Sequence, residues 1–238
     1  MQTNGVRCLL IGGQACVLYG AAEFSRDTDL VIQTDAGNLA CLRSALTELQ
    51  AECIAVPPFE KEYLDLGLAV HFRCGHPEAK SLRIDVMSRL RGVDDFPRLW
   101  ERRTVFDLDG QQVNAIGLAD LVQAKKTQRE KDWPMITRLL ERHYLQHQQD
   151  ATPERVDFWL RELRTLPLLM EVAARFPERR QELEPVRPIL RARILSDEAI
   201  LRTGLRIEME REQEADRVYW EPLKRKLEEL RLNRSRKA

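Results

Sequence analysis

The stretch Ser25–Ile32, with the sequence SRDTDLVI, has two aspartates one residue apart at the start of an apolar run. Residues two apart in a strand point to the same face, about 7 Å apart along the chain. Asp27 and Asp29 would therefore present two carboxylates side by side. Two such charges repel each other, and burying them without a partner is costly. The pair is therefore either a solvated turn that pairs with Arg26 or part of a cation site.

A third carboxylate follows in LRIDVMS, residues 82–88, where Asp85 interrupts an otherwise apolar run of strand length. A lone aspartate inside a buried strand is unusual and needs a reason. If this strand lies beside the first one, three carboxylates converge and can hold two Mg²⁺ ions, because Mg²⁺ prefers oxygen ligands. The alternative is that Asp85 is a buried partner of Arg83 or Arg73.

A glycine pair precedes both aspartate motifs. Gly12 and Gly13 end the apolar run Val6–Ile11 and come directly before a segment that is typical of a short helix. Glycine lets the backbone approach a phosphate closely, and a helix N-terminus offers free N–H groups. The pair is weak evidence alone, but with the three aspartates it indicates a phosphate-binding turn.

The composition sets limits on the class of protein. The chain has 238 residues, 43% of them hydrophobic and 32% charged, with zero formal net charge. These values are typical of a globular protein and exclude a general polyelectrolyte binder of nucleic acid. The five cysteines form no CxxC pair, which indicates reduced thiols. The sequence has neither a secretion signal nor an apolar run of about 18 residues, so we expect a cytoplasmic protein without a membrane partner.

The pattern of residues predicts an α+β fold. Before Gly117, short strand-like runs alternate with one clear amphipathic helix, which is expected over Ala36–Gln50. Asp109-Gly110 is a hairpin signal between two further runs. The expected strands are Val6–Ile11, Asp27–Gln33, Glu52–Val56, Leu68–Cys74, Leu82–Ser88, and the two arms of the hairpin.

The chain after Gly117 is predicted to be all-helical. Two helices are expected on either side of Asp132–Pro134, and Pro134 fits the first turn of the second one. Thr152-Pro153 and Ser196-Asp197 are suitable helix starts. Further helices are therefore expected over Pro153–Leu163, over Leu166–Phe176 and from Ser196 onward.

The order of these motifs resembles the nucleotidyltransferase superfamily typified by DNA polymerase beta. Its pattern is a glycine pair at a helix start, then Asp-x-Asp, then an acidic residue on a later strand. Within it, the segments IGGQACVLYG, SRDTDLVI and LVQAKKTQREKDWPMI are most similar to bacterial abortive-infection and toxin-type nucleotidyltransferases. The resemblance covers Val6 to Leu140. It implies a mixed nucleotidyltransferase-type sheet flanked by helices and followed by an all-helical C-terminal region.

The resemblance also implies the roles of individual residues. Asp27 and Asp29 bind the metals, and Asp85 binds one metal and helps to deprotonate the acceptor hydroxyl. The implied nucleotide-binding residues are Gly12, Gly13, Ser25, Lys125 and Lys131, with Asp132 orienting a basic neighbour. Residues 1–116 would form the catalytic core and 117–238 the helical region, in which 117–150 complete the nucleotide site.

The implied activity is Mg²⁺-dependent transfer of a nucleoside monophosphate from an NTP to a hydroxyl. Two Mg²⁺ ions are expected. The acceptor is a tRNA end, a protein side chain or a small molecule, and a toxin-like role would bring a cognate antitoxin as partner. Two alternatives stay open: a non-catalytic nucleotide- or partner-binding module on the same fold, and an enzyme of the antibiotic-nucleotidylating kind.

Several other polar residues have weaker signals. His71 and Arg73 share one face of their strand and either point toward Asp85 or form a polar cluster on the exposed side of the sheet. His143 and His147 are four residues apart on a predicted helix, and they are interpreted as surface histidines because no glutamate follows His143. The basic end of the chain, residues 231–238, is interpreted as a solvated tail that could touch an RNA backbone.

Overall fold

The computed structural model describes residues 1–235 of the chain. These residues form two compact units. The first unit comprises Met1–Ala124 together with the chain from Val218 onward, and the second is Lys125–Arg217. Each unit is described by itself.

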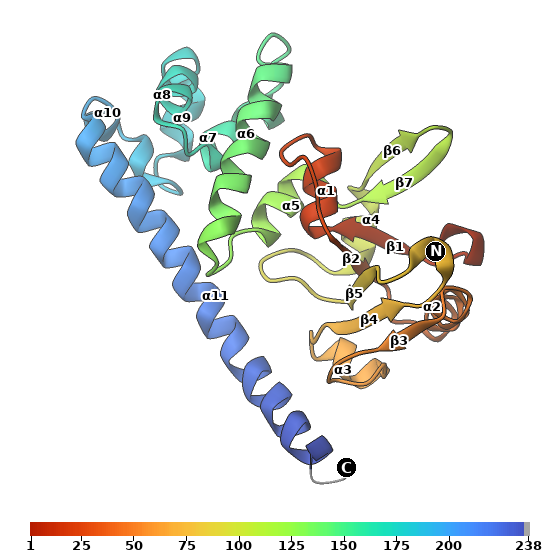
Figure 1. Cartoon of the computed structure of the whole chain (residues 1–238). Coiled ribbons are helices and arrows are strands. Elements are labelled where there is room, and N and C mark those ends of the chain that lie inside the picture. Colours follow the sequence, from red (N-terminus) through yellow and green to blue (C-terminus); the bar gives the residue numbers. More distant parts are fainter. Residues whose placement is uncertain (236–238) are drawn as a thin grey trace. The chain divides into compact units, whose positions relative to one another are not determined.

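The first unit is built on one mixed sheet of seven strands, in the order β3-β4-β5-β2-β1-β7-β6. Figure 1 shows β3, β4, β5, β2 and β1 side by side in this order, with the β6–β7 hairpin beyond. The strands are β1 (Cys8–Ile11), β2 (Asp27–Ile32), β3 (Ala51–Cys53), β4 (Val70–Cys74), β5 (Arg83–Met87), β6 (Thr104–Leu108) and β7 (Gln111–Ala115).

The sheet combines parallel and antiparallel pairs of strands, and the pair that carries the predicted aspartates is parallel. The central pair β2 and β5 is parallel, with Asp29 opposite Asp85. Strand β1 is antiparallel to β2 and parallel to β7, and both edge pairs, β3–β4 and β6–β7, are antiparallel. The prediction of a mixed sheet with antiparallel edges, flanked by helices and followed by a helical region, is therefore confirmed, as is the hairpin at Asp109-Gly110.

The hydrophobic core of this unit covers one face of the sheet. Leu30, Ile84, Val86 and Phe72 belong to the core cluster, as does Leu42 of helix α2 (Ala36–Glu48). Because successive residues of a strand point to opposite faces, the alternate positions of β2, β4 and β5 lie on the other face. The sequence alternation thus puts the polar residues of three adjacent strands together, away from the core.

The other helices of the first unit are short. The α-helices are α1 (Gly12–Leu18), α3 (Lys61–Asp65), α4 (Phe96–Glu101) and α5 (Leu118–Ala124), with 3-10 turns η1 (Gln2–Asn4) and η2 (Pro77–Ala79). The sequence predicted α1 and α5 but neither α3 nor α4. Each of the two missed helices has six residues or fewer, too short to establish a helical repeat of apolar positions.

The second unit is helical. After 3-10 turn η3 (Glu130–Asp132) come α6 (Trp133–His147), α7 (Pro153–Glu162), α8 (Leu166–Arg175), α9 (Pro177–Leu183), η4 (Pro188–Leu190), α10 (Ala192–Leu195) and α11 (Glu198–Ser235). Helix α11 belongs to this unit up to Arg217 and to the first unit from Val218 onward. Their buried residues include Trp159, Tyr144, Ile136 and Leu139. Helix α9 and the short α10 were not predicted. The predicted tail ends in residues 236–238, which lie outside the described residues.

Two helix starts follow the predicted capping chemistry. The Thr152 hydroxyl accepts a hydrogen bond from the backbone N–H of Arg155 at the start of α7. The Asp197 carboxylate accepts from the backbone N–H groups of Ala199 and Ile200 at the start of α11. Side-chain oxygens at these positions satisfy N–H groups that the helix itself leaves without acceptors. Within residues 1–235, none of the helices combines the length and apolar character that crossing a bilayer requires.

Candidate functional site

The three predicted aspartates lie on one face of two adjacent strands. Asp27 and Asp29 of β2 are opposite Arg83 and Asp85 of β5 in the parallel register. All four residues are on the face away from the core, since Leu30, Ile84 and Val86 occupy the core face. The three carboxylates were expected to converge if the strand of Asp85 lies beside the strand of Asp27 and Asp29. The two strands are neighbours in the sheet.

Asp85 is held by two basic side chains. Arg83 donates from Nε to Oδ1 at 2.8 Å and from Nη2 to Oδ2 at 2.9 Å. His71, which is opposite Asp85 on β4, places Nδ1 2.8 Å from Oδ1. Nη2 of Arg83 lies 3.1 Å from the same nitrogen of His71, so the three side chains form one cluster. Asp85 is therefore the buried partner of Arg83, which was one of the two readings of the sequence.

The protonation of Asp85 follows from these contacts. Only 8% of the residue is exposed, and burial alone would raise the pKa of its carboxyl. The hydrogen bonds from His71 and Arg83 outweigh burial, so the pKa of Asp85 is lower than its usual value. Asp85 is ionised at neutral pH and is a weak proton acceptor while both contacts persist.

Arg83 interacts with all three aspartates. Its hydrogen bonds to Asp85 raise the pKa of the guanidinium, and the charges of Asp27 and Asp29 add to this effect. The Arg83 side chain is 39% exposed, so the charge lies at the edge of the cluster. In this arrangement one guanidinium offsets part of the repulsion among three carboxylates. From the sequence, a metal ion was expected to do this.

The glycine pair lies against the aspartate strand. Gly12 has φ +66°, and a Cβ there would lie 1.9 Å from Asp29 Oδ2. A Cβ on Gly13 would lie 2.4 Å from the hydroxyl of Ser25, which donates to the backbone oxygen of Asp27 at 3.2 Å. Glycine is required at Gly12 both by the backbone conformation and by the space. Gly12, Gly13, Ser25 and the Asp27–Asp29 pair thus form one packed group.

The predicted lysines belong to the second unit. Lys125 Nζ lies 3.1 Å from Oδ1 of Asp132, and 12% of the Lys125 side chain is exposed. Asp132 also accepts from the Thr127 hydroxyl at 2.6 Å and from Arg129 Nε at 2.7 Å. Burial alone would raise the pKa of Asp132. Lys125 and the other donors lower the pKa by more than burial raises it, so the carboxyl is ionised. Asp132 orients Lys125, whereas Lys131 is exposed.

The two predictions for histidines have different outcomes. His71 points to Asp85, while Arg73 on the same face is exposed. The prediction of a surface position is wrong for His143, which is half-buried and accepts a hydrogen bond from Trp159 Nε1 at 2.9 Å. Burial, with the nearby His147 and Arg155, lowers the pKa of His143 to about 4. The packing of α6 against α7, which sequence spacing does not reveal, is the reason.

Two of the three aspartates have the chemistry of divalent-cation ligands. Asp27 and Asp29 are half-buried oxygen donors on one face, and such donors fit Mg²⁺. Among residues 1–235, no three His, Cys, Asp or Glu side chains are arranged so that they could hold a metal ion. Asp85 completes the donor set only when Arg83 leaves it. Asp27 and Asp29 thus supply oxygen donors of the right chemistry on one face, while both oxygens of Asp85 accept hydrogen bonds from Arg83 and one of them lies against His71.

Arg83 is the residue whose importance the sequence understated. The sequence indicates it only as a possible partner of Asp85. Its position two residues before Asp85 predicts a side chain on the same strand face. That spacing was available in the sequence, but the parallel register that also brings Arg83 opposite Asp27 was not.

No protein-family model and no curated protein matches the sequence. Among solved structures, the chain is similar to an antigenic nucleotidyltransferase-like protein from Paracoccidioides brasiliensis, with 17% sequence identity and a TM-score of 0.38. The match covers 77% of this chain and 85% of that one. A similarity at this level assigns neither an activity nor a branch of a family.

Proposed function

We propose that the chain is a metal-dependent nucleotidyltransferase, which moves a nucleoside monophosphate from an NTP to a hydroxyl acceptor. The observation that carries the proposal is the parallel register that brings Asp29 opposite Asp85, with Asp27 on the same face. Nucleotidyl transfer needs groups that position a triphosphate and offset its charge. A row of carboxylates on a sheet face is suited to holding the cations that do so.

In this proposal Asp27 and Asp29 would hold Mg²⁺, with a second ion shared with Asp85. When bound, Mg²⁺ neutralises the charge of the triphosphate and lowers the pKa of the attacking hydroxyl. Asp85 joins the site when Arg83 and His71 release it. Arg83 is then available to bind a phosphate oxygen, since guanidinium groups pair well with phosphates. Release also restores the basicity that Asp85 needs as a proton acceptor.

The remaining predicted residues would bind the phosphates. Gly12 and Gly13 pack directly against Asp29 and Ser25, so in this proposal a phosphate next to the aspartates would also lie near this turn and the Ser25 hydroxyl. In the second unit, Lys125, which is oriented by Asp132, and the exposed Lys131 stay proposed as nucleotide-binding residues.

The acceptor is proposed to be a tRNA end or a protein side chain, in a toxin-like role with a cognate antitoxin. Because NTPs and tRNA are abundant in the cytoplasm, the proposal implies a cytoplasmic protein. Incubation with each labelled NTP, Mg²⁺ and either total tRNA or cell lysate tests the activity. Label in one macromolecule, absent with Asp29→Asn and retained with Glu52→Gln on exposed β3, is the expected result. Equal labelling by both variants would contradict the proposal.

A binding module without catalysis is the second candidate. It is favoured by one observation: both oxygens of Asp85 already accept hydrogen bonds from Arg83 and His71. If this arrangement is permanent, the site binds an anion through Arg83 and uses no metal. Thermal unfolding with an NTP separates the candidates. Stabilisation that requires Mg²⁺ favours the enzyme, whereas stabilisation that is equal with EDTA favours the module.

A further inference from the structure

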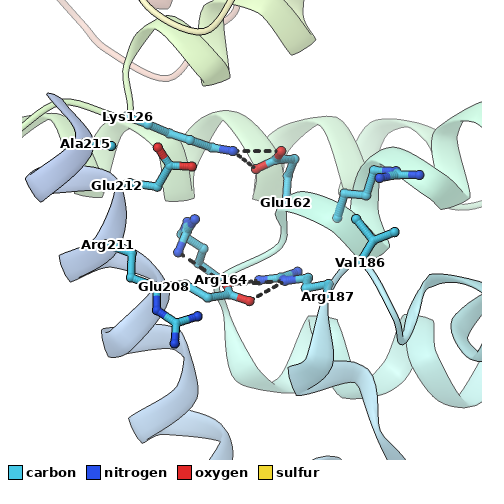
Figure 2. Close-up of a pocket in the computed structure, with 10 residues that line it drawn as sticks. Lys126, Glu162, Arg164, Val186, Arg187, Glu208, Arg211, Glu212 and Ala215 are labelled. Atoms are coloured by element: carbon cyan, nitrogen blue, oxygen red, sulfur yellow. Dashed lines mark hydrogen bonds and ion pairs between the residues drawn. The ribbon is translucent and has the colours of Figure 1, made fainter. Parts of the chain in front are cut away.

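The second unit contains a charged pocket that the proposed activity does not use. Its volume is about 500 Å³, and Figure 2 shows side chains from α7, α11 and the segments between them around it. The lining includes five cationic side chains and three carboxylates. A cavity of this size is within the range of small-ligand sites. Its charge favours an anion.

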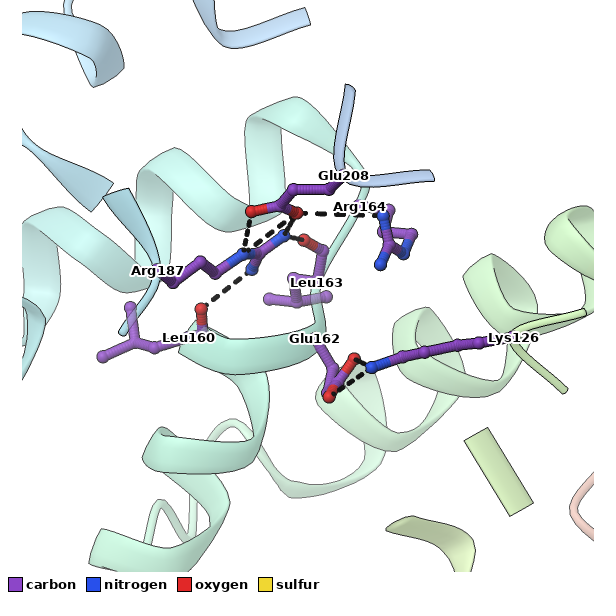
Figure 3. Close-up of polar contacts among 7 residues, drawn as sticks. All are labelled: Lys126, Leu160, Glu162, Leu163, Arg164, Arg187 and Glu208. Carbon is purple, nitrogen blue, oxygen red and sulfur yellow. Dashed lines mark hydrogen bonds and ion pairs between the residues drawn. The ribbon is translucent and has the colours of Figure 1, made fainter. Parts of the chain in front are cut away.

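Two of the cations are paired with carboxylates. Arg187 donates to Glu208, with Nη2 2.9 Å from Oε2, and to the backbone oxygens of Leu160 and Leu163. Lys126 Nζ lies 2.9 Å from Oε1 of Glu162 and 2.8 Å from Oε2. Figure 3 shows both groups. These pairs neutralise two of the three carboxylates, so Arg187 and Lys126 serve the structure.

Arg164 is different. Its side chain is 11% exposed, and the buried Nε and Nη1 atoms have no hydrogen-bond partner. Glu208 Oε2 is 3.8 Å from Nη1, which is beyond hydrogen-bond length. The guanidinium carbon lies 4.8 Å from the centre of the Trp133 ring, which fixes the orientation of the group. Burial, together with the nearby Arg187, lowers the pKa of Arg164.

An arginine in this state is costly, because the group stays protonated and its buried N–H groups lack acceptors. Such a cost is expected where a ligand supplies the missing acceptors. Arg211, which is exposed on α11, and Arg161 add two further cations to the lining. Glu212 is the remaining carboxylate. The excess of positive charge is close to the charge of one phosphate group.

We infer that this pocket binds the phosphate group of a small phosphorylated molecule, with Arg164 as the central donor and Arg211 at the rim. Phosphate offers several acceptor oxygens for the unsatisfied N–H groups and matches the surplus charge. A pocket of about 500 Å³ is of a size that suits a small molecule. The inference concerns the second unit alone and does not depend on the metal site.

The test uses the full chain without Mg²⁺ or NTP, at constant ionic strength. Inorganic phosphate and ribose 5-phosphate should each raise the melting temperature by about 3 °C at saturating concentration, while ribose should not. Arg164→Met should lose this shift. Its melting temperature without phosphate should equal or exceed that of the parent, because the variant no longer buries an unsatisfied charge. Arg206→Gln, on α11 outside the pocket, is the matched control and should retain the shift.

Several results would overturn the inference. These are no shift with the parent chain, an equal shift with Arg164→Met, or a fall in the phosphate-free melting temperature with the shift retained. Binding of an RNA without terminal phosphates through Arg164, without binding of either small probe, would overturn the choice of ligand. If Arg164→Met does not fold, Arg211→Gln replaces it. That variant should bind phosphate about tenfold more weakly, and unchanged binding would contradict the assignment.

Discussion

Asp29 on β2 lies opposite Asp85 on β5 in a parallel register. The pairing joins residues far apart in the sequence and puts their carboxylates on the face of the sheet away from the core. Arg83 precedes Asp85 by two residues and lies on the same face, where it interacts with both aspartates and with Asp27. The site thus contains its own positive charge, and this arrangement leads to the first prediction.

Arg83→Gln should destabilise the chain in EDTA. The change removes two donors from a buried carboxylate and leaves three carboxylates with less compensation, so we expect a loss of about 1–3 kcal/mol in the free energy of unfolding. Mg²⁺ should restore much of this loss. Arg73→Gln removes the same charge from the adjacent position of β4 and should change stability by less than about 0.5 kcal/mol. Urea unfolding with EDTA or Mg²⁺ measures both; a Mg²⁺ effect no larger in Arg83→Gln than in the parent would contradict the account.

Gly12→Ala should cost more than Gly5→Ala. Both glycines have nearly the same φ, +66° and +67°, so the backbone cost of alanine is about 1 kcal/mol at each. A Cβ at Gly5 meets nothing within 4 Å, whereas one at Gly12 would meet Asp29 Oδ2 at 1.9 Å. The extra loss should be about 1–3 kcal/mol. Urea midpoints compare the two variants, and equal losses would show that Asp29 moves aside freely.

His143 should make stability depend on pH. Its pKa is about 4 in the folded chain and about 6.5 in the unfolded chain. Between these values the unfolded chain binds the proton and the folded chain does not. The contribution is therefore complete above about pH 6.5 and is lost as pH falls toward about 4, by on the order of 3 kcal/mol.

His143→Gln keeps an acceptor for Trp159 and removes the titration. Unfolding at a series of pH values should show a shallower decline for this variant than for the parent chain. His76→Gln, in the first unit, is the control and should keep the parent slope. An NMR titration in which the His143 ring gains its proton near pH 6.5 in the folded chain would contradict the assignment.

Asp132→Asn should be strongly destabilising. Asp132 is 4% exposed and accepts from Lys125, Thr127 and Arg129. Removing one member of a buried ion pair costs about 3 kcal/mol. Because the folded pKa of Asp132 is lowered, this contribution is present above pH 4 or so and is lost as pH falls through the folded pKa. Asp150→Asn removes an exposed carboxylate paired with Arg155 and should cost less than about 1 kcal/mol; similar losses in urea unfolding would refute the difference.

Much of the sheet could be predicted because its signals are local. The apolar alternation in β2 and β5 and the turn at Asp109-Gly110 depend on neighbouring residues, and the unusual position of Asp85 in an apolar run indicated that its strand had a polar neighbour. Register is a different matter, since it depends on residues distant in sequence. Nothing near Arg83 indicated that it would lie opposite Asp27.

The helical half was predictable only where its residues repeat at helical spacing. Helices α6, α7 and α8 have clear apolar faces, but α9 is short and rich in arginine and glutamate, and α10 has only four residues. Arg164 shows the limit most clearly. In sequence it is one arginine among many, and only packing against Trp133 and Arg187 makes it a buried cation without acceptors.

Binding of Mn²⁺, followed by electron paramagnetic resonance, tests the central claim that β2 and β5 together hold a divalent cation. Mn²⁺ accepts the same oxygen ligands as Mg²⁺. The account predicts binding by the parent chain, a loss of about tenfold or more in affinity for Asp29→Asn, and an unchanged affinity for Glu52→Gln. Absence of binding by the parent chain, or equal affinity in all three proteins, would contradict it.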